Sequence, residues 1–254
     1  MNYKKPLILV TNDDGYQAKG IASLTEVMRD LGEVIIFAPD SPRSGMSSAI
    51  STSHPLRANL YRKEENLTAY ICNGTPVDCV KLALNEFTDR KPDLLVSGIN
   101  HGSNAGVSLI YSGTMGAAIE GSLFGIPSIG FSLCDFAPDA DFSFTAEVAR
   151  KLAAKVIEEG LPKGISLNVN VPAGEVKGIR IAAQTRGKWV NEYYRSKDGQ
   201  DRDVFWVTGN FENWEEENDS CDEWAMSNGY AAVVPVQVDM TAYDIIPRLK
   251  EWRL

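Results

Sequence analysis

Histidine and cysteine are scarce in this sequence, with two histidines and four cysteines among 254 residues. The cysteines (Cys72, Cys79, Cys134 and Cys221) have neither the paired spacing of a zinc site nor the density of a disulfide-stabilised domain. A structural zinc centre and a disulfide scaffold are therefore excluded. We expect reduced, mostly buried thiols in a cytoplasmic protein.

Positive charge and long apolar runs are also lacking. Lys and Arg number 25 against 34 Asp and Glu, which gives a net charge of −9. Surfaces for nucleic-acid polymers and anionic membranes need clustered Lys and Arg, so the composition argues against both. No run approaches the ~20 apolar residues of a membrane helix. The apolar stretch 6–10 after Lys4 and Lys5 is too short for a signal peptide.

The order of apolar segments predicts an α/β fold. A strand at Leu7–Val10, a helix over 21–31 and a strand at Val34–Ala38 form a βαβ unit. Further strands are expected at 67–72, 93–97, 126–132 and 165–171, with a helix from Pro76, capped by Thr75, and another over 145–158. We therefore expect a Rossmann-like, mostly parallel sheet with helices on both faces.

The pattern changes after residue 171. Extended segments at 178–184, 203–207 and 230–238 alternate with polar, aromatic and acidic stretches. The acidic run 212–223, with Trp214 and Trp224 at its ends, is interpreted as a solvated loop with aromatic anchors. No linker is evident, so 1–254 is expected to be one domain. Its core with the active site spans 1–175, and an extended region over 176–254 serves self-association.

Two adjacent carboxylates, Asp13 and Asp14, end the first apolar run. They lie just past the carboxyl end of the first strand, and ligands of open α/β sheets bind in the crevice outside such strand ends. Adjacent side chains diverge within a strand, but where the backbone turns they can converge on one hard cation. A solvated turn is the alternative interpretation. The position after the first strand favours a site.

Two later loops add neutral oxygen atoms at the same edge of the sheet. Ser44 follows the second strand, and Asn100 follows the strand expected at 93–97. With Asp13 and Asp14 they make an all-oxygen set that suits Mg²⁺, Mn²⁺ or Ca²⁺ and suits structural zinc poorly. With so few protein charges, the site would keep water and stay open to substrate, as a catalytic metal site does.

The Gly-rich loop 98–106 leads to a second group of small residues. Ser112, Gly113 and Thr114 directly precede a helix, where backbone N–H groups and the helix dipole make an anion site. Neither a P-loop nor the usual dinucleotide-binding pattern is present. His101 lies in the loop and is expected to be a neighbour of substrate, not the general base. Close packing without a ligand is the alternative for this loop.

Five stretches, in this order, resemble the SurE survival-protein family of metal-dependent 5′/3′-nucleotidases. They are 12–15, 38–47, 73–80, 97–106 and 111–118, beginning with Asn-Asp-Asp-Gly. Several motifs in order are far more specific than any one of them, and the resemblance covers residues 7 to about 132. Met115 stands where the family has Val, a small apolar change that should not alter the chemistry.

The resemblance implies a role for individual residues. Metal ligands fall on Asp13, Asp14, Ser44 and Asn100, and Asp13, Asp14 and Asn100 are also expected to be catalytic. Phosphate-binding positions fall on Asn104, Ser112, Gly113 and Thr114. The resemblance further implies one divalent ion per subunit, Mg²⁺ or Mn²⁺, and release of phosphate from nucleoside monophosphates, with some action on short polyphosphate. It also implies a homodimer or homotetramer whose subunits exchange C-terminal segments.

Other functions remain open at this stage. A nucleoside hydrolase also uses an aspartate cluster after its first strand and a metal, although it normally needs more Asp residues there. A nucleotide-binding sensor without catalysis is the second alternative, because no feature of the sequence distinguishes it from an enzyme. Within the nucleotidase reading, water attacks phosphorus directly, or Asp14 attacks it and forms a phosphoenzyme.

Overall fold

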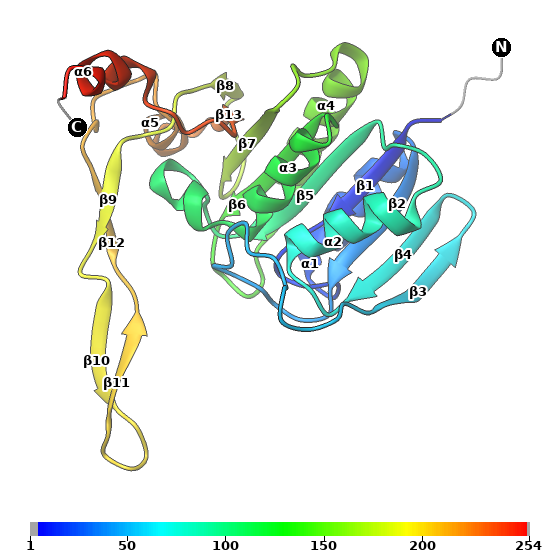
Figure 1. Ribbon diagram of the computed structural model, residues 1–254, viewed down its shortest axis with the longest axis horizontal. Helices are drawn as coiled ribbons and strands as arrows, with labels where there is room; N and C mark the ends of the chain where they lie inside the picture. The colour runs from blue at the N-terminus through cyan, green and yellow to red at the C-terminus, as the bar shows by residue number, and fades with distance from the viewer. Residues whose placement is uncertain (1–4, 253–254) are drawn as a thin grey trace.

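Nine strands form the central sheet of the protein, in the order β3-β4-β2-β1-β5-β6-β7-β13-β8 (Figure 1). The computed structural model describes residues 5–252. The strands of the sheet are β1 (Leu7–Thr11), β2 (Glu33–Pro39), β3 (Ala58–Glu64), β4 (Leu67–Cys72), β5 (Leu94–His101), β6 (Ser128–Cys134), β7 (Ile165–Pro172), β8 (Ile179–Ile181) and β13 (Ala231–Gln237). All neighbours in the sheet are parallel except β3 with β4 and β13 with β7. The predicted mostly parallel α/β sheet is confirmed.

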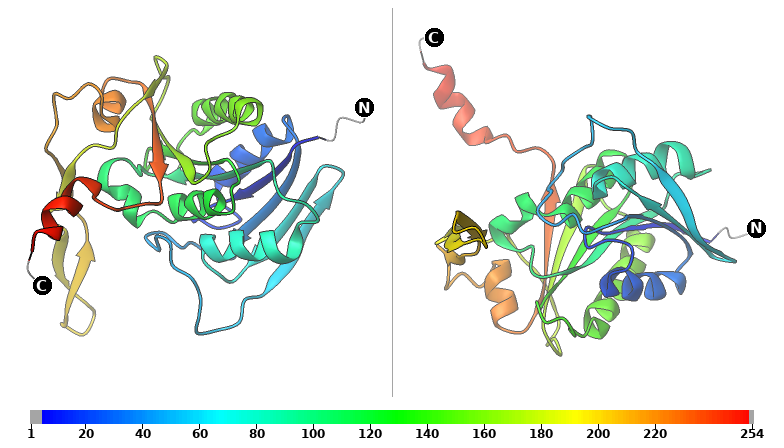
Figure 2. Two further views of the ribbon diagram at one scale, coloured as in Figure 1. Left: turned by 45° about the horizontal axis from the view of Figure 1, so that its top comes forward. Right: turned by 90° about the horizontal axis from the view of Figure 1, so that it is seen from below.

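Helices cover both faces of this sheet (Figures 1 and 2). The helices are α1 (Lys19–Arg29), α2 (Pro76–Leu82), α3 (Gly113–Leu123), α4 (Ser143–Glu159), α5 (Asp222–Ser227) and α6 (Ile246–Lys250), with a π-helical segment η1 (Ala83–Phe87) and two short 3₁₀ helices, η2 (Gly106–Tyr111) and η3 (Tyr243–Ile245). Helices α1 and α4 bury one apolar cluster against one face, with Leu24 and Val148 in it. A second cluster, with Phe37 and Val80, lies under α2 and α3.

Helix α2 begins as the sequence predicts. Thr75 Oγ1 accepts a hydrogen bond from Asp78 N at 3.1 Å, and Asp78 Oδ2 accepts one from Thr75 N at 2.9 Å. This reciprocal cap satisfies two backbone donors that the first turn of a helix leaves free. Within residues 5–252, none of the helices has the length and apolar character needed to cross a bilayer.

Strand β5 is longer than the predicted strand at 93–97. It continues to His101, so the expectation that Asn100 and His101 lie in a loop was wrong. Pairing with β6 is interrupted between Ser97 and Asn100 and then resumes, with Asn100 opposite Ser132. Because the irregularity lies inside the strand, Gly98 marks a distortion of the strand and not its end.

The chain after residue 175 does two different things. Strands β8 and β13 join the central sheet, whereas β9 (Gly187–Val190), β10 (Tyr193–Lys197), β11 (Asp203–Val207) and β12 (Asn210–Asn213) form a long two-stranded arm that projects from the body (Figure 1). Helix α6 extends in a different direction from the arm (Figure 2, right). The arm exposes large aromatic side chains, namely Tyr193, Tyr194, Phe205 and Trp206.

Candidate active site

Asp13 and Asp14 lie where the order of the strands reverses. Strand β1 pairs with β2 on one side and with β5 on the other, so the chain moves outward in one direction to β4 and then returns to β5. This topological switch point opens a crevice at the carboxyl ends of the strands, which is where open α/β sheets bind ligands.

Asp13 contacts the start of helix α3. Its side chain is 3% exposed, and its Oδ1 accepts a hydrogen bond from Thr114 Oγ1 at 2.5 Å. A Cβ atom at Gly113 would lie only 2.9 Å from Asp13 Oδ2 and Cβ, so the backbone can approach this carboxylate only because residue 113 is Gly. The structure thus brings together Asp13, Gly113 and Thr114, which lie 100 residues apart in the sequence.

Asp14 and Asn100 are held by backbone groups. Asp14 Oδ2 accepts a hydrogen bond from His101 N at 3.1 Å, and Asn100 Nδ2 donates to Gly102 O at 2.8 Å. Among residues 5–252, no hydrogen bond occupies Asp14 Oδ1, Asn100 Oδ1 or Asp13 Oδ2. Each of the three side chains therefore keeps one oxygen available.

Ser44 lies in the loop after β2, with an exposed side chain. The loop is tied to the first carboxylate because Arg43 N donates to the backbone oxygen of Asp13 at 2.6 Å. Ser44 is thus next in sequence to a residue that contacts Asp13, and its own side chain is exposed.

These oxygens fit a divalent cation. Burial raises the pKa of Asp13 to about 6, against the opposing hydrogen bond from Thr114, and burial also raises the pKa of Asp14. Within the described chain, no Lys or Arg lies within ion-pairing distance of either carboxylate. Two adjacent acids and a free amide oxygen are hard oxygen donors of the kind that Mg²⁺, Mn²⁺ and Ca²⁺ prefer.

The raised pKa of Asp13 predicts how the metal-free protein responds to pH. The folded state holds the Asp13 proton more tightly than the unfolded chain, whose value is 3.8, so rising pH destabilises the fold between these values. The free energy of unfolding can be measured with urea in the presence of a chelator. Between about pH 4.5 and about pH 7.5, that of the wild type should fall by ~2 kcal/mol relative to that of Asp13→Asn. A constant difference between the two proteins would contradict this expectation.

The start of helix α3 offers backbone donors beside Asp13. Ser112 is the N-cap, and its Oγ accepts a hydrogen bond from Met115 N at 3.1 Å. The cap uses the third N–H of the helix and not those of Gly113 and Thr114, of which the Thr114 N–H also lies near the Asp13 carboxylate and lowers its pKa. An anion placed there would also be favoured by the positive end of the helix dipole.

Asn104 belongs to a buried amide network that the sequence reasoning missed. Its Nδ2 donates to Ser132 Oγ at 2.9 Å, its N donates to Asn170 Oδ1 at 2.8 Å, and its O accepts from Asn168 Nδ2 at 2.8 Å. Asn168 and Asn170 alternate with apolar residues along β7, so both point to the same face. In the sequence, this network is indicated only by two Asn residues that lie two positions apart in a mostly apolar strand.

Asp222 corrects the interpretation of the acidic run. It was expected to lie in a solvated loop, but it is fully buried. Its carboxylate accepts hydrogen bonds from Gly106 N at 3.0 Å, Thr185 N at 2.9 Å and Thr185 Oγ1 at 2.6 Å. Asp222 therefore fixes the end of the loop that carries Asn104. Because burial depends on these three distant donors, charge density in the sequence could not reveal it.

His101 lies on the other side of Asp14, beside a small cavity. The cavity holds about 210 Å³ and is lined by Asp14, Lys19, His101 and Phe142, among others. The His101 ring packs edge-on against Phe142 at 5.8 Å, and its Nε2 is buried without a partner among the described residues. The structure thus places His101 next to Asp14, and its role as a neighbour of substrate stays a prediction.

The chain is similar to known proteins in family, in sequence and in structure. A family described as "Survival protein SurE" matches residues 8–191. The chain is 51% identical to the "5′-nucleotidase SurE" of Phocaeicola vulgatus, over 100% of this chain and 99% of that protein. It is 53% identical to that of Bacteroides thetaiotaomicron, over 98% and 96%. A crystal structure of the SurE protein from Aquifex aeolicus superposes with a TM-score of 0.82 at 35% identity, covering 96% of this chain and 98% of that one.

Proposed function

We propose, because this chain belongs to the SurE survival protein family, that it is a metal-dependent 5′-nucleotidase that releases phosphate from nucleoside monophosphates. The single observation that supports this most directly is the contact between Asp13 and Thr114, which puts a carboxylate pair against the start of a helix. A cation on the carboxylates and a phosphate on the helix would then be neighbours. Action on 3′-nucleotides and on short polyphosphate belongs to the same proposal.

In this proposal Asp13, Asp14, Ser44 and Asn100 hold one divalent ion per subunit, Mg²⁺ or Mn²⁺. When bound, such an ion supplies Lewis-acid chemistry, which neutralises charge on a phosphate ester and lowers the pKa of water. The Asp13 hydrogen bond to Thr114 orients one carboxylate oxygen and leaves the other for the ion. The backbone hydrogen bond from His101 does the same for Asp14.

The phosphate would lie against the start of helix α3. The N–H groups of Gly113 and Thr114, with the Ser112 hydroxyl and the Asn104 amide, would stabilise the equatorial oxygens as charge develops on them. The Thr114 side chain already donates to Asp13, so its contribution to phosphate binding would come from its N–H group. Water is proposed to attack phosphorus directly, with no histidine acting as base.

One assay tests this function against its alternatives. Incubating the protein with a nucleoside monophosphate and Mn²⁺ should yield free phosphate. Free base would instead indicate a nucleoside hydrolase, and neither product would indicate a sensor. When a single turnover is run in ¹⁸O water, label should appear in the released phosphate. Label in the Asp14 carboxylate would overturn direct attack by water.

Asn104→Ala is expected to lower kcat by about tenfold, the size of effect of losing one hydrogen bond to a charged group. Metal affinity should remain nearly unchanged, because the contacts of Asn104 run to Ser132, Asn168 and Asn170 and not to the carboxylates. Steady-state kinetics and Mn²⁺ titration measure the two quantities separately. If the variant loses metal affinity in parallel with kcat, Asn104 acts on the metal site instead.

The proposed assembly is a homodimer or homotetramer that exchanges C-terminal segments. Two observations support this assembly: the arm β9–β12 exposes aromatic side chains, and none of the residues of α6 is buried. Both leave apolar surface that a single chain does not cover. Light scattering at micromolar concentration should give at least twice the mass of one chain. A strict monomer would remove the support. The four unpaired cysteines agree with a proposed cytoplasmic location.

A further inference from the structure

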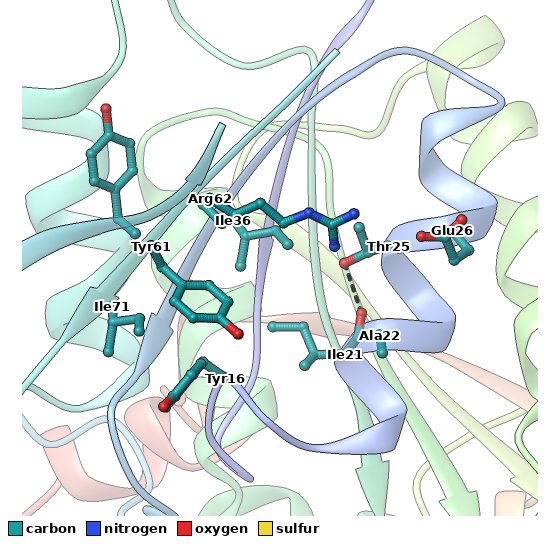
Figure 3. A pocket seen from close by; sticks show the side chains of 11 residues that line it. Tyr16, Ile21, Ala22, Thr25, Glu26, Ile36, Tyr61, Arg62 and Ile71 are labelled. Carbon is teal, nitrogen blue, oxygen red and sulfur yellow. Dashed lines mark hydrogen bonds between the residues drawn. The ribbon is translucent and has the colours of Figure 1, made fainter. Parts of the chain in front are cut away.

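A separate cavity lies between helix α1 and the edge of the sheet (Figure 3). It holds about 180 Å³. Its floor is apolar, made by Ile21 and Ala22 of α1 with Ile36, Ala69 and Ile71 of β2 and β4. For scale, a cavity of about 150 Å³ in another protein accommodates benzene. The space therefore suits a small ring system, and a fused ring would project at the open side, where Tyr61 is 59% exposed.

Two tyrosines form an aromatic wall of this cavity. The rings of Tyr16 and Tyr61 meet edge to face, with centroids 5.1 Å apart and planes at 74°. Within residues 5–252 neither phenol hydroxyl has a hydrogen-bond partner in the protein, so both can bond to the polar edge of a ligand. Aromatic rings that meet in this geometry stabilise one another beyond the area that they bury.

A distortion of β3 directs two successive side chains to the cavity. Pairing of β3 with β4 shifts between Leu60 and Arg62, which interrupts the alternation of side chains between the two faces. Tyr61 and Arg62 consequently both line the cavity, and Arg62 extends across it toward Thr25 (Figure 3). Leu60, their neighbour, does not line it.

The charges at the rim cancel. Arg62 pairs with Glu64, Glu64 pairs with Arg29 at 3.0 Å, and Arg29 pairs with Glu26 at 3.5 Å. The two charged residues that line the cavity, Arg62 and Glu26, are each paired within this chain of alternating charges, so neither is left as an unpaired charge for a phosphate or an ammonium group. A ligand of this cavity should therefore be uncharged.

We propose that this cavity binds the planar ring of an uncharged heteroaromatic compound, specifically the base of a nucleoside. The preference for an uncharged ring comes from the cavity itself. The choice of a nucleoside rests on the proposed function, because dephosphorylation of a nucleotide generates one. A nucleotide would be disfavoured, because the cation that lines the cavity, Arg62, is already paired with Glu64, and the carboxylate of Glu26 also lines it.

The cavity is linked to the carboxylate loop through Tyr16. Tyr16 lies two residues after Asp14, and its N donates to Pro39 O at 3.0 Å at the end of β2. The same loop is closed by Asn12 Nδ2, which donates to Gly15 O at 2.9 Å. A ring packed against Tyr16 would therefore contact the loop that carries Asp13 and Asp14.

Calorimetric titration with adenosine tests the proposal on the full-length protein. The variant Tyr61→Ala removes one of the two rings of the aromatic wall. Because Tyr61 is 59% exposed, this substitution should leave the fold intact. We expect at least about tenfold weaker adenosine binding, equal to ~1.4 kcal/mol. Leu60→Ala is the matched control, since Leu60 is similarly exposed on the same strand, and it should bind adenosine as the wild type does.

Asp13→Asn separates this cavity from the active site. Adenosine binding should persist in this variant, and saturating inorganic phosphate should not displace adenosine from the wild type. Equal affinity in Tyr61→Ala and the wild type, or loss of binding in Asp13→Asn, would overturn the proposal. So would the absence of binding by the wild type up to about 5 mM adenosine, a limit that corresponds to ~3 kcal/mol. Phosphate release is assayed separately, so failure of the nucleotidase function would leave these results interpretable.

Discussion

Removal of divalent ions is expected to abolish phosphate release, with kcat/KM falling by at least about 10³-fold, equivalent to ~4 kcal/mol of transition-state stabilisation. Asp13 and Asp14 are buried, adjacent and without an ion-pairing partner in the described chain, and the site lacks a nucleophile-base pair that would act alone. Chelation followed by addition of Mn²⁺ or Mg²⁺ should restore turnover. Full activity in a metal-stripped sample would contradict the proposed site.

A measurement independent of catalysis accompanies this prediction. An ion that binds only the folded state at about 100 times its Kd stabilises it by ~2.7 kcal/mol. For a chain of this size that corresponds to a rise in Tm of about 5–10 °C. Thermal unfolding with and without Mn²⁺ therefore detects binding of the ion even if a nucleoside monophosphate is not the substrate.

Asp13→Asn is expected to lower kcat/KM by about 10²-fold or more, which is ~3 kcal/mol. The amide keeps the shape of the carboxylate but removes its charge, and it disturbs the hydrogen bond that Asp13 accepts from Thr114. Stability of the metal-free variant should not fall, because burial makes the Asp13 charge costly.

Asp30→Asn provides the control for this substitution. Asp30 is an exposed residue just after α1, so the same chemical change there should leave both turnover and the Mn²⁺-dependent rise in Tm unchanged. Asp13→Asn should lose most of that rise in Tm. A variant that loses turnover but keeps the full rise would show that Asp13 acts on the substrate and not on the ion.

The sequence predicted the strands and helices well wherever local pattern decides structure. Strand β4 has the predicted bounds, and helix α2 starts at Pro76 with the predicted cap, since each depends on residues close in the chain. The carboxylates after β1 were recognisable for the same reason. Their place at the switch point follows from the order of the strands, which a βαβ pattern restricts strongly.

Long-range contacts explain what could not be predicted. The extension of β5 to His101 depends on pairing with β6, and the burial of Asp222 depends on donors 37 and 116 residues away in sequence. Acidic residues in a run are usually solvated, so the local pattern favoured the wrong environment. The metal-ligand and phosphate roles of Asp13, Asp14, Ser44, Asn100, Asn104, Ser112, Gly113 and Thr114 remain predictions for the experiments above.

The bond between Asp222 and Gly106 has a consequence for synthesis of the chain. A ribosome delivers residues in order, so the Gly-rich loop emerges more than a hundred residues before the carboxylate that fixes it. Strand β7 likewise waits for β13 to cover its open edge. A nascent chain that ends near residue 175 would hold both Asp13 and α3, yet its loop would be unanchored and its sheet would end in an uncovered strand. Catalytic competence should therefore appear only late, when most of the polypeptide has left the exit tunnel.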